Sequence, residues 1–300
     1  MKLTILGTSG STPTKNRNLS SLLINFDGSN YLFDAPEGCQ QQMMKANASY
    51  LKIQAIFLTH LHADHVLGFP GIIATMNIHQ RSSPLIVFGP KGTKEFVKDS
   101  LKLIGLRPVF SIRIIETKEG KILETEKFFV EAAKANHDIS CYGYVFKEKD
   151  SLGKFLKQKA LDLGIPEGPM FSKLQKGENI KFEGKNISWK QVMDESQKKL
   201  GKKVSYIVDT LPDRHYFKAI KDSDVLFHDS AFLDKDKLMA KQRMHSTAKQ
   251  AAEIAEKTGC KKLFLIQLSA RYSDDALFEN EARMVFAESH TAKDLQKIEL

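Results

Sequence analysis

The stretch Thr59-His60-Leu61-His62-Ala63-Asp64-His65 follows directly on the apolar run Ile56-Phe57-Leu58. His60 and His62 are two positions apart, so on an extended segment both side chains leave the same face and can bind one ion. Asp64 and His65 follow at a turn that opens a helix, where a second ion can be bound. Zinc accepts imidazole and carboxylate ligands, and no cysteine lies nearby to close a thiolate site. The stretch predicts an open, catalytic metal centre, and the alternative is a histidine-rich loop without metal.

Composition sets the class of protein. The chain has 300 residues, 42% of them hydrophobic, and a formal charge of +9. This charge is compatible with an anionic partner such as nucleic acid, and equally with a lysine-rich surface. Cys39, Cys141 and Cys260 are isolated and show no CxxC spacing, which argues against a disulfide framework and a zinc ribbon. Without a signal peptide or a long apolar run, we expect a cytoplasmic protein with no membrane contact.

Strand and helix patterns alternate along the chain, which predicts an α/β fold with helices covering sheets. Strands are expected at 3–6, 21–25, 31–34, 53–59, 84–89, 142–147, 204–209, 225–228 and 262–268. Helices are expected at 38–46, 64–79, 93–103, 246–258 and 275–288.

A lysine-rich segment from Lys147 to about Lys199 stands apart from this pattern. It contains Gly164-Ile165-Pro166-Glu167-Gly168-Pro169 and one helical stretch of note, near Ser151–Leu163. We expect it to supply little core and to form a protruding arm, residues 148–199, inserted into a single globular domain. An ordinary long surface excursion is the alternative.

Two further residues are candidate ligands for a binuclear site. His137 comes just before a predicted strand, and Asp209 ends one. Binuclear hydrolase sites typically add an isolated histidine and a bridging carboxylate at strand ends. Taken alone, each residue also fits a turn or a hydrogen-bonded loop.

The pattern HxHxDH, a lone histidine and a strand-end aspartate resembles the metallo-β-lactamase superfamily, whose fold is an αββα four-layer sandwich with a dinuclear metal centre. Four other segments resemble the ribonuclease Z family within it: Pro13–Asn18 (a PxKxRN loop), Gly164–Gly177 (a Gly-Pro arm), Met244–Thr247 (an HST box) and Leu268–Tyr272 (the end of an HFSxRY box). That family implies a metal-dependent endoribonuclease that removes the 3′ trailer from precursor tRNA.

The resemblance also implies roles for individual residues. His60, His62 and His137 would hold one zinc ion, Asp64 and His65 a second, and Asp209 would bridge them. Asp64 would accept a proton, and His245, supported by Asp229, would donate one to the leaving oxygen. The implied substrate-binding residues are Lys15, Arg17, Asn18, Ser269, Arg271, Gly168 and Pro169. The arm lysines Lys154, Lys157, Lys159, Lys173 and Lys176 can contact tRNA phosphates.

The sequence departs from the family at two positions. Gln267 stands where the family has a histidine ligand, and an amide oxygen is a poorer zinc ligand that suits harder ions such as Mn²⁺ or Mg²⁺. Asp229 replaces a glutamate and is one methylene shorter, so it can reach His245 only if the backbones lie closer together.

The expected partners are precursor tRNA and a second copy of the chain, since in the family the arm of one subunit serves the active site of the other; no protein partner is indicated. Two alternatives stay open: a hydrolase of another phosphodiester or ester, and a degenerate RNA-binding relative with an impaired second metal site. His79, His215 and His290 match no motif and are interpreted as surface or packing residues.

Overall fold

The computed structural model describes residues 1–300, which divide into two compact units. Unit 1 consists of residues 1–125, 129–147 and 203–300, and unit 2 of residues 126–128 and 148–202. No helix combines the length and apolar character needed to cross a membrane.

The first sheet of unit 1 has seven strands in the order β20-β1-β3-β4-β5-β6-β7. In chain order they are β1 (Lys2–Gly7), β3 (Ser21–Phe26), β4 (Ser29–Phe33), β5 (Ile53–Phe57), β6 (Leu85–Gly89), β7 (Ile112–Glu116) and β20 (Lys297–Glu299). Neighbours from β4 to β7 are parallel, so their carboxyl ends meet at one edge of the sheet.

The second sheet also has seven strands, in the order β19-β17-β16-β15-β10-β9-β8. They are β8 (Gly120–Glu124), β9 (Phe128–Ala135), β10 (Cys141–Glu148), β15 (Lys203–Ile207), β16 (Val225–Asp229), β17 (Leu263–Ile266) and β19 (Ser289–Thr291). β15, β16, β17 and β19 are parallel neighbours. A short parallel pair, β2 (Ser9–Gly10) and β18 (Leu268–Ser269), lies apart from both sheets.

Buried aromatic rings join the inner faces of the two sheets. Phe33 of β4 lies 6.1 Å, between ring centroids, from both Tyr144 of β10 and Tyr206 of β15, and Phe57 lies 5.4 Å from Tyr144. Such contacts bury large apolar area in favourable tilted geometry.

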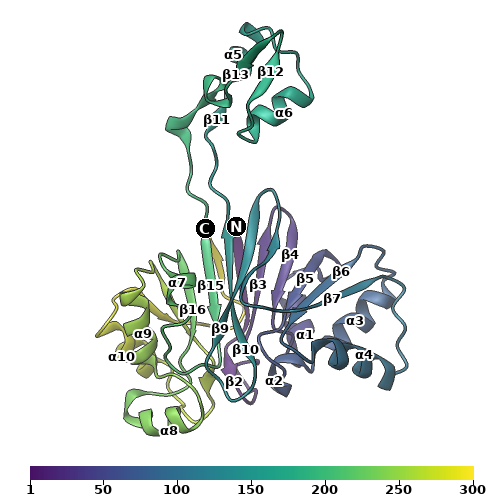
Figure 1. Cartoon of the computed structure of the whole chain (residues 1–300). Helices are drawn as coiled ribbons and strands as arrows, with labels where there is room; N and C mark the ends of the chain where they lie inside the picture. Colours follow the sequence, from purple (N-terminus) through teal and green to yellow (C-terminus); the bar gives the residue numbers. More distant parts are fainter. The chain divides into compact units, whose positions relative to one another are not determined.

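Helices cover the outer face of each sheet (Figure 1). α1 (Cys39–Lys45), α3 (Phe69–Ile78) and α4 (Thr93–Leu103) share an apolar core with the first sheet. α7 (Phe217–Ile220), α8 (Lys237–Gln242), α9 (Ala248–Lys257) and α10 (Ala276–Arg283) share one with the second. Short 3₁₀ turns occupy Tyr50–Lys52 and Asp234–Asp236. Unit 1 is therefore an αββα sandwich, as the resemblance implied.

One predicted helix is wrong in its extent. Residues 64–79 form two helices, α2 (Ala63–Val66) and α3, separated at Leu67 and Gly68. Pro70 lies in the first turn of α3, where a missing N–H costs nothing, but it cannot continue a helix that is already running. The break places the carboxyl end of α2 against the loop after β4, where Ala35 N–H donates to the His65 carbonyl at 2.8 Å.

Unit 2 corrects two expectations for the segment after Lys147. Its helix covers only Lys157–Asp162 (α5), because Lys154–Phe155 (β11) pairs with Met193–Asp194 (β14) instead. A second helix, α6 (Pro169–Gln175), a hairpin of β12 (Ile180–Phe182) and β13 (Lys185–Ile187), and 3₁₀ turns at Trp189–Val192 and Glu195–Gln197 complete the unit.

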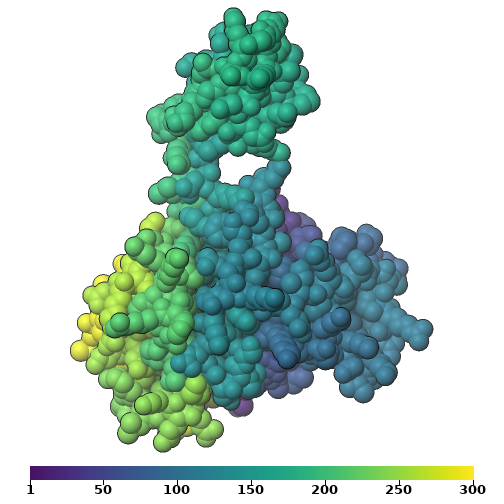
Figure 2. All heavy atoms as spheres, in the orientation of Figure 1, coloured from purple at the N-terminus to yellow at the C-terminus, as the bar shows by residue number.

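Unit 2 also has a small core of its own, contrary to the expectation of little core. This core contains Ala160, Ile165, Phe171, Leu174, Ile180, Ile187 and Val192. In Figure 2 the atoms of residues 148–202, teal to green, pack closely together. Lysines and apolar residues thus alternate in short amphipathic elements, whose apolar residues form the core. The lysine content of the segment alone does not predict this core.

Candidate metal centre

Three histidines from two loops converge on one point. His60 and His62 follow β5, and His137 follows β9. His62 Nδ1 lies 3.0 Å from His60 Nε2 and 3.3 Å from His137 Nε2. Ligand atoms bonded to one tetrahedral zinc at about 2.0–2.1 Å lie about 3.3–3.4 Å apart. The three nitrogens therefore have the spacing of ligands to a single ion, and form a group able to hold a metal.

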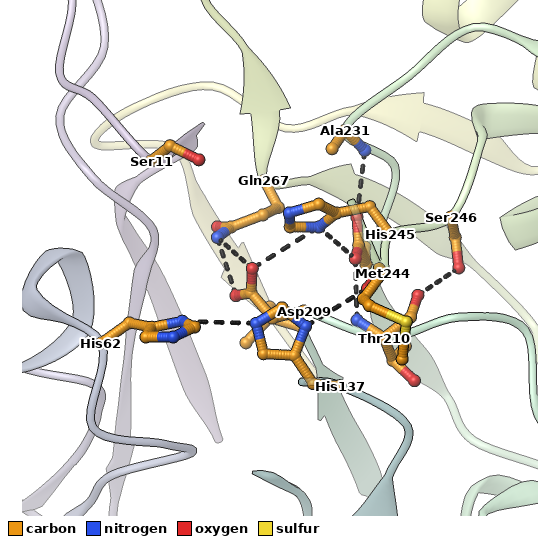
Figure 3. A network of polar contacts seen from close by, with 12 residues as sticks. Ser11, His62, His137, Asp209, Thr210, Ala231, Met244, His245, Ser246 and Gln267 are labelled. Carbon is orange, nitrogen blue, oxygen red and sulfur yellow. Dashed lines mark hydrogen bonds and ion pairs between the residues drawn. The ribbon is translucent and has the colours of Figure 1, made fainter. Parts of the chain in front are cut away.

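Hydrogen bonds on the far side of the ring orient two of these histidines, His60 and His137. His137 Nδ1–H donates to the Met244 carbonyl at 3.3 Å, so the Nε2 atom carries the lone pair (Figure 3). Asp138 Oδ1 lies 3.1 Å from this Nε2. The Thr59 hydroxyl donates to the Asp34 carboxylate, so it accepts from His60 Nδ1–H at 3.0 Å. Such partners fix the tautomer and ring orientation of metal-binding histidines.

A second group lies beside the first and shares His60. His65 Nε2 is 2.9 Å from Asp209 Oδ2 and 3.5 Å from Asp64 Oδ2. His65 Nδ1–H donates to Asp34 at 2.8 Å, and Ser11 N–H donates to Asp64 Oδ2 at 3.0 Å. His60, His65 and Asp209 thus form a second group able to hold a divalent cation, and the Asp64 carboxylate lies beside His65.

Parallel strands explain why distant residues meet here. Asp209, Asp229 and Gln267 stand at the carboxyl ends of the three neighbouring strands β15, β16 and β17. Side chains at the carboxyl ends of parallel strands share one edge of the sheet, where α/β proteins place their sites.

The charges of the centre favour a cation. Burial lowers the pKa of His60 well below its ordinary value, and neighbouring His65 adds to that effect, so this imidazole stays neutral and able to bind metal. Burial also disfavours charge on His65, but Asp209 and Asp34 on its two sides raise its pKa well above the ordinary value. The carboxylates of Asp209 and Asp34 therefore stabilise a positive charge at the position of His65. Because donor types, spacing and charge agree, the residues fit a divalent metal centre.

His245 and Asp229 form a pair next to the metal-binding groups. His245 Nδ1–H donates to Asp229 Oδ2 at 2.9 Å and lies 3.5 Å from Asp209 Oδ1. Asp229 is fully buried and also accepts from Thr210 N–H at 2.8 Å and Ala231 N–H at 3.0 Å. The shorter aspartate thus reaches His245. Burial lowers the pKa of His245, yet Asp229 and then Asp209 raise it to about 9, which favours the protonated imidazole.

Some of the remaining predicted site residues line a cavity next to His245, and the others lie elsewhere in the chain. Gln267, Ser269 and Arg271 line the same cavity of about 440 Å³ as Asp64 and His245. The side chain of Lys15 is exposed, whereas the Arg17 guanidinium pairs with Asp275. Asn18 is held by Asp294 and by the Glu37 carbonyl. Gly168 and Pro169 open α6 in unit 2.

The three histidines without a motif lie outside the centre. His79 contacts the Tyr50 ring, His215 pairs with Asp213, and His290 lies near Arg283.

Sequence reasoning missed the residues that orient the ligands. Asp34, fully buried behind His65 and Thr59, ends a predicted strand just as Asp209 does, so the same strand-end argument applies to it. Asp34, Asp209 and Gln267 have φ of 58°, 50° and 68°. Residues other than glycine rarely adopt such angles, which tend to cluster at functional sites.

Comparisons with known proteins agree with this geometry. The chain is 41% identical to the Ribonuclease Z of Nitrosopumilus maritimus over 300 residues, covering 100% of both chains. It is 39% identical to the Ribonuclease Z of Methanosarcina acetivorans, covering 100% of this chain and 98% of the relative. Residues 1–151 match the family model described as Anti-Pycsar protein Apyc1.

Solved structures show the same fold. The crystal structure of human tRNase Z, short form (ELAC1), has a TM-score of 0.73 and 25% identity, covering 100% of this chain and 99% of that one. The metallo-β-lactamase fold protein YhfI of Bacillus subtilis has a TM-score of 0.71 at 16% identity, covering 99% and 98%. The fold is therefore that of the metallo-β-lactamases, as predicted.

Proposed function

Because this chain belongs to the ribonuclease Z family, we propose that it is the metal-dependent endoribonuclease that removes the 3′ trailer from precursor tRNA. The products are a tRNA with a 3′ hydroxyl and a trailer with a 5′ phosphate. The observation that carries the proposal is the His245–Asp229 pair beside the two histidine-rich groups able to hold a metal, with His245, His62, His137 and Asp209 lining one cavity. The alternative of a hydrolase for another ester is not favoured, because the full-length relatives share the Ribonuclease Z name.

We propose zinc as the ion held by His60, His62 and His137, with Asp209 between this position and that of Asp64 and His65. Three imidazoles are a ligand set that suits zinc. Bound divalent cations lower the pKa of water and neutralise charge on the phosphoryl oxygens.

The chain's own residues supply the proton transfers. Asp64, held by Ser11 N–H, accepts a proton from the attacking water. His245, whose Nδ1–H is held by Asp229, presents Nε2 to the leaving 3′ oxygen and protonates it. Arg271 and Ser269, which line the same cavity, bind the scissile phosphate.

Unit 2 is the proposed tRNA-binding arm. Residues 148–202 contain twelve lysines and eight acidic residues. Lys154, Lys157, Lys159, Lys173 and Lys176 are exposed, although Lys157 pairs with Glu167 and Lys176 with Glu126. A basic surface that binds phosphates reads the shape of tRNA rather than its sequence.

We also propose a homodimer in the cytoplasm. Four exposed apolar side chains, Ile78, Leu103, Ile104 and Val109, lie at the ends of α3 and α4 and in the following loop, and support contact with a second copy. The three cysteines are free and buried, which supports a reducing compartment. Light scattering after gel filtration measures the mass, and a monomer at all concentrations would contradict the dimer.

Single-turnover cleavage of one precursor tRNA tests the reaction. Changing His245→Asn removes the proton donor, so we expect cleavage to slow by about 10²–10⁴-fold while metal content is unchanged. His215→Asn is the matched control, because His215 is exposed and pairs only with Asp213. Cleavage at the same rate in both variants, or products other than a 3′ hydroxyl and a 5′ phosphate, would refute the proposal.

A further inference from the structure

The side-chain amide of Gln267 lies at the second metal position with its N–H groups, and not its oxygen, directed at the other donors. Its side chain is fully buried at the end of β17. The amide Nε2–H₂ donates to both oxygens of Asp209, at 3.0 and 2.7 Å (Figure 3). The same nitrogen lies 3.1 Å from His65 Nε2. The amide oxygen Oε1 is buried and has no hydrogen-bond partner. The amide therefore points its positive end at the donors that would bind a second cation.

Binding a cation there requires the amide to turn over. A cation beside Asp209 and His65 attracts Oε1 and repels Nε2–H₂, so the two amide atoms must exchange places. This turn breaks both hydrogen bonds to Asp209. It also moves the amide N–H groups to the place where Oε1 now finds no partner, and unpaired buried donors are costly. Gln267 makes no hydrogen bond to His60, His62 or His137, so this turn leaves the three imidazoles of the first position undisturbed.

The two positions also differ in donor chemistry. The first offers three imidazole nitrogens, which suit zinc. The second offers the carboxylates of Asp64 and Asp209, the His65 imidazole and, after the turn, the Gln267 amide oxygen. Three of these four donors are oxygens, which suit Mn²⁺ and Mg²⁺ better than zinc.

We propose that Gln267 makes the centre unequal, with one tight zinc position and a second, weaker position that selects an oxygen-preferring divalent cation such as Mn²⁺. This inference rests on the proposed function only in using the same metal centre. One side chain therefore determines which metal ion the second position prefers. Replacing its amide with an imidazole should make the second position prefer zinc.

Metal stoichiometry tests this inference without RNA. Metal-free protein is equilibrated with Zn²⁺, with Mn²⁺ or with both, unbound metal is removed, and metal per chain is measured by mass spectrometry and by the electron paramagnetic resonance of Mn²⁺. We expect one tightly bound zinc, a second zinc weaker by about 10–100-fold, and one zinc plus one manganese from the mixture.

Variants assign the effect to the side chain. Gln267→His should bind two zinc ions of similar affinity and exclude manganese. Gln158→His, which adds an exposed imidazole on α5, is the matched control for adventitious zinc and should behave as the unaltered protein. Two zinc ions of equal affinity in the unaltered protein would overturn the inference, and so would an unchanged metal content in Gln267→His. Cleavage of precursor tRNA by the same preparations separates this failure from that of the proposed function.

Discussion

At the scale of single residues, Asp229 is one methylene shorter than the glutamate that the family has at this position, and the surrounding residues fit the shorter side chain. The three hydrogen bonds that its carboxylate accepts, from His245, Thr210 and Ala231, lie between 2.8 and 3.0 Å, and the residue is fully buried. Asp229→Glu, although it restores the family's glutamate, adds a methylene to a packed site. We expect it to lower the free energy of unfolding by about 1–3 kcal/mol and to slow cleavage.

Urea denaturation and single-turnover kinetics check this prediction. Asp213→Glu is the control, because that carboxylate contacts His215 and Asn136 rather than His245. Faster cleavage by Asp229→Glu would mean that the aspartate is a defect instead of an adapted residue.

Residue spacing in the sequence predicted which side chains could bind metal, but not how they are held. His60, His62, Asp64 and His65 lie within six positions, so local geometry alone brings them together. Asp34 contacts His65 across 31 positions, and Gln267 contacts it across 202. Contacts over such separations depend on strand order, which periodicity in the sequence does not contain. The direction of the Gln267 amide likewise follows from its neighbours and not from its identity.

At the scale of elements, nine of the fourteen strands in the two large sheets were predicted, whereas β7, β8, β9, β19 and β20 were not. Apolar runs mark the buried strands, but the missed strands carry exposed or half-exposed residues. The break between α2 and α3 was also not predicted, because it depends on packing at Gly68. A Cβ on Gly68 would lie 1.9 Å from the Pro36 carbonyl oxygen, so only glycine allows the two segments this close approach.

Gly68→Ala should therefore displace the α2–α3 junction from the loop after β4. We expect a loss of about 1–3 kcal/mol in the free energy of unfolding, together with weaker binding of the second, weaker zinc ion, because His65 and Asp64 of that position lie in the adjacent helix α2. Gly71→Ala is the matched control. Its Cβ would meet only the end of Gln40 at 3.6 Å, in an exposed turn of α3, so it should gain up to about 1 kcal/mol. Chemical denaturation and zinc titration of both variants measure these opposite effects, and equal behaviour would contradict the role given to Gly68.

At the scale of the whole molecule, the two units connect through adjacent strands. Lys147 of β10 and Lys203 of β15 are paired residues of an antiparallel ladder, so the chain leaves and re-enters unit 1 at neighbouring positions. Residues 148–202 can thus be replaced by Asn-Gly, which forms the tight turn that an antiparallel pair requires. Unit 1 keeps both of its sheets and its cores in such a variant.

This replacement separates chemistry from substrate selection. We expect the variant to fold, to bind zinc and to hydrolyse a small chromogenic phosphodiester at the rate of the full chain, because the metal centre lies wholly in unit 1. Cleavage of precursor tRNA should fall by at least about 10²-fold and lose most of its dependence on salt, since phosphate contacts made by lysines release counterions. The triple change of Lys154, Lys159 and Lys173 to Gln should give an intermediate loss, which added salt reduces. Full cleavage of precursor tRNA by the replacement variant would show that unit 2 does not bind the substrate, while the loss of both activities would place unit 2 in the folding of the centre itself.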